Sequence, residues 1–259
     1  MRKQRSLVKS TSGCHGFLLR HISETSVAIV IRLGLDGLTN LLGVDFVKQA
    51  KPIRVKIVGC GGIGCELIPT LSRYLAYAYD KYSTVEITLI DGDSYEPGNS
   101  ARQHFKSTIN KAQETANSLT PQFPRILFKA FPHYLMDNNV AEVIQEGDVV
   151  MSCVDNHDTR LLISNRCCKL NNVVFVSGGN DYEDGNLQVH VRENGKNKTL
   201  PIANRFHPEI LNPTDMNPGK IKPVEKGCEK LIETSSPQLL FTNKSIASFM
   251  LNCLWTQQD

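Results

Sequence analysis

Residues 54–64 read Arg-Val-Lys-Ile-Val-Gly-Cys-Gly-Gly-Ile-Gly, an apolar run that leads directly into a glycine-rich turn. Arg54–Val58 predicts a β-strand, and Leu67–Tyr79 carries apolar residues at helical intervals. Gly59, Gly61 and Gly64 fill a Gly-x-Gly-x-x-Gly pattern between them. In a strand–turn–helix context this pattern leaves backbone N–H groups facing a phosphate at the positive end of the helix. The competing interpretation is a tight turn that binds no ligand.

The rest of the chain continues an alternation of strands and helices, which predicts a parallel sheet with crossover helices. We expect an α/β fold, with a doubly wound, Rossmann-like, mainly parallel sheet, helices on both faces and an antiparallel extension at the C-terminal side. The further strands predicted are Val85–Ile90, Arg125–Phe131, Asp148–Val154, Val173–Ser177 and Asn186–Arg192. The further helices are Thr108–Leu119 with Thr108 as N-cap, Val140–Gln145, Arg160–Leu170 and Pro237–Leu254.

The composition fits one large domain of an enzyme, with 259 residues and 41% hydrophobic content. We divide the chain into an N-terminal arm at residues 1–50 and a main domain at 51–259, in which 194–227 form a long irregular loop. The net charge of +3 and the scattered basic residues give no nucleic-acid footprint. The apolar run Val27–Ile31 is too short to span a membrane. We therefore expect a soluble, cytoplasmic protein.

The eight cysteines have no C-x-x-C spacing, so we predict no four-cysteine zinc site. Cys228 is the best candidate for a reactive thiol, because three nearby lysines could lower its pKa if it is partly exposed. A free structural cysteine is the alternative. We expect the others to pack in the core or in the glycine turn: Cys60, Cys65, Cys153, Cys167, Cys168 and Cys253.

An acidic residue, Asp91, ends the second predicted strand, where its carboxylate could accept hydrogen bonds from ribose hydroxyls. This position suits NAD and ATP equally well. The segment that follows, residues 91–105, is polar and charged, and a dehydrogenase has no obvious need of it.

That segment, Asp-Gly-Asp-Ser-Tyr-Glu-Pro-Gly-Asn-Ser-Ala-Arg-Gln at residues 91–103, resembles the D-x-D-x-V-E-x-x-N-x-x-R-Q signature of the ThiF, MoeB and ubiquitin-activating enzyme family. The resemblance implies that Asp91 holds the ATP ribose and Arg102 contacts the triphosphate. It also implies a lysine on the phosphates at the start of the next helix, which Lys111 fits, with Lys106 as its rival. The remaining nucleotide-binding residues implied are Gly62, Asp93, Asn99 and Gln103.

Residues 148–160 resemble the strand-ending Asp-Asn element of the same family, with Asp155 and Asn156 at the end of the strand. A Mg²⁺ ion prefers carboxylate and phosphate oxygens, and Asp155 stands where doubly wound sheets bind ligands. Asp155 is thus our metal candidate, and Asn156 joins the nucleotide pocket. The alternative role is a helix N-cap, for Asp155 or for Asp158.

The resemblance implies an ATP-dependent adenylyltransferase that activates the C-terminal carboxylate of a ubiquitin-like or sulfur-carrier protein, with Arg102, Lys111, Asp155 and Cys228 as catalytic residues. It also implies a homodimer, in which Arg32 or Arg54 could reach the partner's phosphates. Cys228, Gln238 and residues 243–247 resemble a plasmid-associated subgroup, the PRTRC system ThiF family proteins. An NAD-binding oxidoreductase and a non-catalytic nucleotide-binding module are the alternatives.

Overall fold

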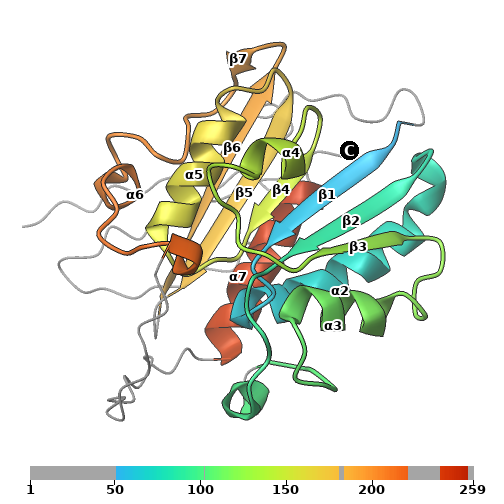
Figure 1. Cartoon of the computed structure of the whole chain (residues 1–259). Coiled ribbons are helices and arrows are strands. Elements are labelled where there is room, and N and C mark those ends of the chain that lie inside the picture. Colours follow the sequence, from blue (N-terminus) through green and yellow to red (C-terminus); the bar gives the residue numbers. More distant parts are fainter. Residues whose placement is uncertain (1–50, 102, 181–183, 221–239, 256–259) are drawn as a thin grey trace, which may run out of the picture.

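One mixed sheet organises the computed structural model, which describes residues 51–101, 103–180, 184–220 and 240–255. Its strand order is β3-β2-β1-β4-β5-β6-β7 (Figure 1). The first five strands are parallel, and β6 and β7 extend the sheet antiparallel, as the sequence predicts. The strand bounds are β1 Ile53–Val58, β2 Val85–Ile90, β3 Leu127–Phe131, β4 Val149–Ser152, β5 Val173–Asn180, β6 Gly185–Glu193 and β7 Lys196–Asn197.

Helices cover both faces of the sheet, with α2, α3 and α7 on one side and α4 and α5 on the other (Figure 1). The α-helices are α2 Gly62–Tyr77, α3 Lys111–Leu119, α4 Val140–Val143, α5 His157–Cys167, α6 Pro208–Leu211 and α7 Leu240–Trp255. Short 3₁₀ turns are η1 Tyr79–Lys81, η2 Pro97–Ala101 and η3 Pro218–Lys220. The expected N-terminal arm, residues 1–50, lies outside the described residues.

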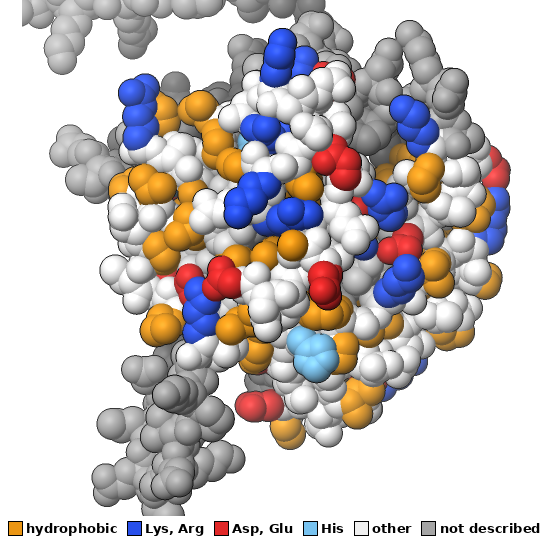
Figure 2. All heavy atoms as spheres, turned by 45° about the horizontal axis from the view of Figure 1, so that its top comes forward, with side chains coloured by type: hydrophobic (Ala, Val, Ile, Leu, Met, Phe, Trp, Pro, Cys, Tyr) orange, Lys and Arg blue, Asp and Glu red, His pale blue; other side chains and the backbone are white. Residues whose placement is uncertain are grey.

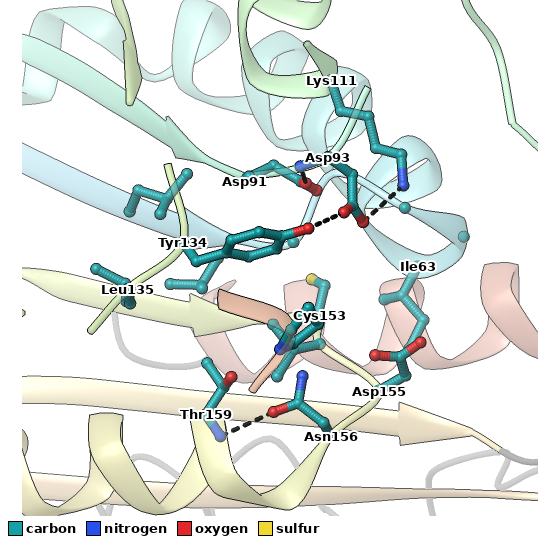
Figure 3. A pocket seen from close by; sticks show the side chains of 18 of the residues that line it. Ile63, Asp91, Asp93, Lys111, Tyr134, Leu135, Cys153, Asp155, Asn156 and Thr159 are labelled. Atoms are coloured by element: carbon teal, nitrogen blue, oxygen red, sulfur yellow. Dashed lines mark hydrogen bonds and ion pairs between the residues drawn. The ribbon is translucent and has the colours of Figure 1, made fainter. Parts of the chain in front are cut away.

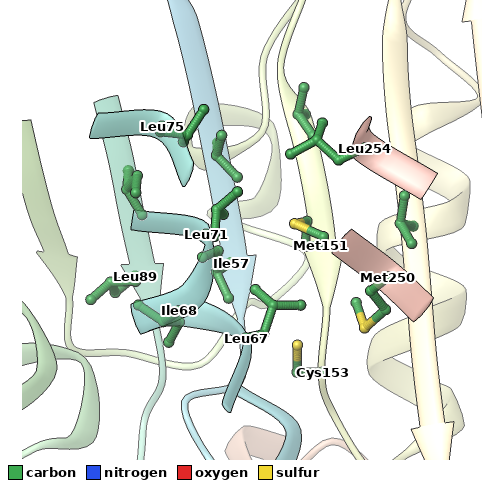
Figure 4. Close-up of a cluster of buried hydrophobic side chains, with 14 of the residues drawn as sticks. Ile57, Leu67, Ile68, Leu71, Leu75, Leu89, Met151, Cys153, Met250 and Leu254 are labelled. Carbon is green, nitrogen blue, oxygen red and sulfur yellow. The ribbon is translucent and has the colours of Figure 1, made fainter. Parts of the chain in front are cut away.

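Each face of the sheet has its own hydrophobic core. Alternate residues of β1, such as Val55 and Ile57, pack with Leu67 and Leu71 of α2 and with side chains of α7 (Figure 4). On the opposite face, Phe175 and its neighbours pack against α4 and α5. This two-sided burial explains why the central strands are almost continuously apolar.

The register of the central strands brings their carboxyl ends to one edge. Val58 at the end of β1 pairs with Ile90 of β2 and with Ser152 of β4. The residues that follow these strands therefore leave the sheet side by side, at the position where open α/β sheets bind ligands. At the other end of β1, Arg54 forms an ion pair of 2.8 Å with Asp148 and so lies away from this edge.

The predicted start of α3 is wrong. Asn110, not Thr108, is the N-cap, and its Oδ1 accepts a hydrogen bond from the N–H of Gln113. The residues before α3 pair instead with the segment after β2, through a bridge between Ser94 and Asn110. Because of this pairing, α3 begins only at Lys111.

Most of the other predicted boundaries differ by a few residues from the observed ones. Helix α2 begins directly in the glycine turn at Gly62, and α5 begins at His157 because Asn156 caps it. Strand β5 continues to Asn180 because it pairs with β6 as far as Gly185. The predicted irregular loop is not wholly irregular, since it contains β7, α6 and η3.

The face at the top of Figure 1 carries basic side chains interspersed with acidic and apolar ones (Figure 2). Among the described helices, none combines the length and apolar character that a membrane span needs.

Candidate functional site

A cavity of about 510 Å³ opens at the carboxyl edge of the sheet. Its walls come from the glycine turn, from the loops after β2, β3 and β4, from the end of β5 and from the segment before η3. The residues that line it include Gly59, Gly61, Gly62, Ile63, Asp91, Gly92, Asp93, Asn99, Gln103, Lys111, His133, Tyr134, Leu135, Cys153, Val154, Asp155, Asn156, Thr159, Asn180, Asn217 and Pro218.

The glycine turn forms the floor of the cavity. Gly59 has a φ of +94°, and a Cβ there would lie 2.9 Å from the carbonyl oxygen of Cys153. A Cβ on Gly64 would collide with the carbonyl oxygen of Gly59, so the turn can be this tight only with glycine at both positions. Gly61 caps α2 without a side chain, and the first turn of the helix contains no acidic residue. The backbone N–H groups at the start of α2 are thus available to an anion.

Asp91 stands at the rim of the floor, where the sequence predicts a ribose-binding carboxylate. Its two oxygens accept hydrogen bonds from the backbone N–H groups of Cys60 (2.7 Å) and Asp93 (2.8 Å). Burial raises the pKa of Asp91, although nearby Lys111 and the two N–H groups oppose that shift. The carboxylate is therefore fixed in direction, with further lone pairs left for a ligand.

Lys111 and Asp93 form an ion pair of 3.1 Å beside Asp91 (Figure 3). Lys111 opens α3, and its side chain is only 12% exposed. Its rival Lys106 is exposed and does not line the cavity. The second oxygen of Asp93 accepts a short hydrogen bond from the hydroxyl of Tyr134. Burial and Asp93 raise the pKa of Tyr134, so its phenol remains a proton donor.

Two amide side chains close the cavity beyond the glycine turn. Asn99 lies in η2, and its Oδ1 accepts a hydrogen bond of 3.0 Å from the N–H of Glu96. Gln103 is buried, and its Oε1 has no hydrogen-bond partner among the described residues. A buried acceptor without a donor is unfavourable unless a ligand or water supplies one. Arg102, the predicted contact to the triphosphate, lies outside the described residues.

Asp155 lies in the short loop between β4 and α5, where it lines the cavity and does not cap α5. The cap is Asn156, whose Oδ1 accepts a hydrogen bond of 2.9 Å from the N–H of Thr159. The alternative interpretation of Asp155 and of Asp158 as N-caps is thus wrong, because the amide one residue after Asp155 takes that position. Asp155 lines the same cavity as Ile63 of the first turn of α2 (Figure 3).

Sequence reasoning missed the segment that covers one side of the cavity, residues 215–220. Asn217 is buried, accepts a bond from the N–H of Gly219 and donates from Nδ2 to the carbonyl oxygen of Leu135 (2.6 Å). Asp158 accepts bonds from the N–H of Asn217 (2.9 Å) and from Lys220 (3.0 Å). We call residues 215–220 the strap. The sequence signals only turns here, since asparagine, proline and glycine carry no periodicity.

The sequence also gave no signal for Tyr134. A Cβ on Gly92 would lie 2.5 Å from the Tyr134 ring, and a Cβ on Gly219 of the strap would lie 2.9 Å from the Cβ of Tyr134. Both positions therefore need glycine to leave room for Tyr134.

The cysteines near the sheet are packing residues. Cys60, Cys65, Cys153, Cys167 and Cys253 are buried as predicted, whereas Cys168 is only half-buried. Burial raises the pKa of Cys60 and Cys65, and raises the pKa of Cys153 to about 12. These thiols therefore stay protonated at neutral pH. Cys228 lies outside the described residues.

Comparison with known proteins decides the family, because the ThiF family profile matches residues 36–226. The chain belongs to the ThiF family. Its relatives in this family include the molybdopterin-synthase adenylyltransferase of Escherichia coli, which is 33% identical over 162 residues, or 60% of this chain and 61% of the relative. The adenylyltransferase and sulfurtransferase MOCS3 of Drosophila sechellia is 33% identical over 59% of this chain and 33% of that protein. The chain thus spans less than two thirds of these ThiF relatives.

Solved structures agree on the fold of this ThiF family chain. E. coli MccB aligns with a TM-score of 0.55 and 19% identity, over 82% of this chain and 56% of MccB. MccB crystallised with ATP aligns with a TM-score of 0.52 over 82% of this chain and 58% of MccB, again at 19% identity. At this identity the likeness concerns the fold alone.

Proposed function

We propose that this chain uses ATP to adenylylate the C-terminal carboxylate of a small ubiquitin-like or sulfur-carrier protein, with release of pyrophosphate. One observation carries the proposal: a single cavity gathers the glycine turn, three aspartates and a lysine. The names of its relatives as adenylyltransferases support the same activity.

The proposed binding mode follows the order of groups along the cavity. The phosphates lie over Gly59, Gly61, Gly62 and Gly64, where the start of α2 offers N–H groups. The ribose hydroxyls donate to Asp91. Lys111, which forms an ion pair with Asp93, contacts the phosphates, and Arg102 provides a second cation. Asn99, Gln103 and Asn156 complete the pocket; Gln103 suits this role because its buried oxygen needs a donor.

We propose Asp155 as the protein ligand of a Mg²⁺ ion. Among the described residues no cluster of three or more His, Cys, Asp or Glu side chains could hold a metal by itself. Mg²⁺ often takes one or two carboxylates and completes its shell with phosphate oxygens and water, and Asp155 offers one such carboxylate in the cavity. When bound, the ion would neutralise charge on the phosphates.

The proposed reaction needs positioning and charge neutralisation rather than a protein nucleophile. A carboxylate oxygen of the substrate attacks the α-phosphorus of ATP and forms a C–O–P link. The bond from that phosphorus to the oxygen bridging to the β-phosphorus breaks, and pyrophosphate leaves with the electron pair. The product is an acyl adenylate. Lys111 and the N–H groups of α2 stabilise the charge that accumulates on the phosphates.

A thioester step through Cys228 remains a prediction. The buried thiols of Cys60 and Cys153 are poor alternatives, because burial raises the pKa of each. The homodimer, the cytoplasmic location, the PRTRC subgroup and the division into arm and main domain are likewise predictions.

Exchange of radiolabelled pyrophosphate into ATP tests the proposal, with the purified protein and small proteins encoded beside it that end in Gly-Gly. We expect exchange that depends on the carrier and on Mg²⁺, and that falls at least about 100-fold in Asp155→Asn. Asp80→Asn serves as the control, since Asp80 is 86% exposed and lies in η1, away from the cavity. Stabilisation by NADH but not by ATP and Mg²⁺ would contradict the proposal and favour an oxidoreductase.

A further inference from the structure

Helix α7 lies beyond residues 36–226, the part of the chain that matches the family. It packs against α2, β5 and β6 (Figure 1). The contact is close because glycines of the sheet face it: a Cβ on Gly185 would lie 2.5 Å from the side chain of Ile246, and one on Gly178 would collide with Met250. The helix therefore has little room to shift relative to the sheet.

The first turn of α7 brings Asn243 to the glycine turn. Asn243 is completely buried. A Cβ on Gly62 would lie 2.6 Å from its Nδ2, 2.9 Å from Oδ1 and 3.0 Å from Cγ, so the whole amide group faces Gly62. Gly62 is the first residue of α2 and lines the cavity.

The same amide also contacts a second residue that lines the cavity. Asn180 at the end of β5 donates from Nδ2 to Oδ1 of Asn243 at 3.0 Å, and Asn180 lines the cavity. The Nδ2 of Asn243 has no acceptor within the part of the chain that the structure describes. Asn243 thus links the floor of the cavity at Gly62 to its wall at Asn180.

The amide is neutral, and this matters at the start of a helix. The N-terminal end of α2 carries a partial positive charge that attracts anions, and a carboxylate in contact with Gly62 would compete with a phosphate for it. The nearest acidic side chain on α2, that of Glu66, lies beyond the first turn and is 3.9 Å from Lys244 of α7.

We propose that Asn243 is a positioning residue of the phosphate subsite. Through its contact with Gly62 it holds the first turn of α2 against the end of β5, and it keeps that turn free of negative charge. The inference rests on the proposed binding of ATP, but it concerns a helix outside the matched family region.

Two variants and a control test this role in the full chain. Asn243→Asp keeps the shape and adds a negative charge, whereas Asn243→Leu removes the polar group without adding charge. Asn252→Asp adds the same charge to an exposed position of the same helix. Calorimetry gives the Kd for ATP with Mg²⁺, ligand-observed NMR gives the Kd for adenosine, and the Tm reports folding.

We expect Asn243→Asp to weaken ATP binding by about 10-fold or more, and Asn243→Leu by about 3-fold to 5-fold. Adenosine has no phosphate, so its affinity should change by less than about 2-fold. Asn252→Asp should bind both ligands as the wild type does. Wild-type ATP affinity in Asn243→Leu, or an equal loss of ATP and adenosine in either Asn243 variant, would overturn the inference. A wild-type protein that binds neither ligand would instead refute the proposed function.

Discussion

The ammonium group of Lys111 lies 3.1 Å from the carboxylate of Asp93, inside the cavity and next to the glycine turn. The ion pair with Asp93 holds the ammonium group of Lys111 in the cavity. Because the hydroxyl of Tyr134 donates to the other oxygen of Asp93, the negative charge of this aspartate is shared between two donors. In the proposed ATP complex, Lys111 would exchange Asp93 for a phosphate group as its anionic partner.

Lys111→Ala should reduce kcat/KM for ATP in pyrophosphate exchange by about 10-fold to 100-fold, because it removes a cation from the phosphates. Lys106→Ala is the matched control, since Lys106 is exposed, five residues earlier in the chain, and should leave kcat/KM unchanged. The ATP concentration series separates the effect on KM from that on kcat. Equal losses in both variants would contradict the special role of Lys111, because the exposed lysine would then matter as much for nucleotide binding as the cavity lysine.

Gly64→Ala should abolish nucleotide binding and lower the free energy of unfolding by about 2–4 kcal/mol. The reason is steric, because the new methyl group would collide with the carbonyl oxygen of Gly59 and force the turn open. Gly98→Ala is the control: a Cβ there meets nothing within 4 Å. Urea denaturation and ATP titration of both variants measure the two effects. Wild-type ATP binding by Gly64→Ala would mean that the turn does not need its present shape.

Tyr134→Phe keeps the ring packed against Gly92 and Gly219 but removes the hydrogen bond to Asp93. A hydrogen bond to a charged group contributes about 1.5–3 kcal/mol, so we expect a loss of stability within or just below that range. The Kd for ATP should rise as well, because Asp93 then holds Lys111 more strongly. Tyr77→Phe, at a residue 86% exposed, should change neither quantity. Unchanged stability and an unchanged Kd for ATP in Tyr134→Phe would show that the hydroxyl contributes to neither.

The strap should loosen in acid through Asp158. Burial raises the pKa of Asp158, but the N–H of Asn217 and the ammonium of Lys220 outweigh it and hold the pKa below its ordinary value of 3.8. A carboxylate whose pKa is lower in the folded state stabilises the fold above its ordinary pKa, and that contribution disappears as the pH falls through the folded pKa. The wild type should therefore be more stable than Asp158→Asn at pH 7, with a difference that shrinks below pH 4.

Urea denaturation of both proteins between pH 7 and pH 3 measures that difference. Asp137→Asn is the control, because Asp137 lies 3.9 Å from the same lysine but is 78% exposed. A difference that stays constant down to pH 3 would contradict the role assigned to Asp158.

Much of the site could be predicted because it depends on short-range patterns and one topological rule. The glycine turn follows β1 directly, and Asp91 and Asp155 each follow a parallel strand closely. Since the carboxyl ends of adjacent parallel strands share an edge, these residues meet in the fold although they are far apart in the sequence. The predicted start of α3 was wrong because a non-local contact decides it. The bridge from Ser94 to Asn110 overrides the local preference of Thr108 for an N-cap position.

Tyr134 and Asn217 could not be predicted in this way. Tyr134 contacts Asp93 across 41 positions of sequence, and Asn217 contacts Leu135 across 82. Neither residue belongs to a periodic segment, so hydrophobic pattern carries no information about their partners. Their position depends instead on how the strap docks on α5.

The pairing of β1 with β4 has a kinetic consequence. Gly59 packs against the carbonyl of Cys153, but every element from α2 to β4 lies between these two residues in the sequence. Contacts between such distant positions form slowly, because a long loop must close before they become favourable. During refolding from denaturant, the capacity to bind nucleotide should therefore return later than the helical signal in circular dichroism.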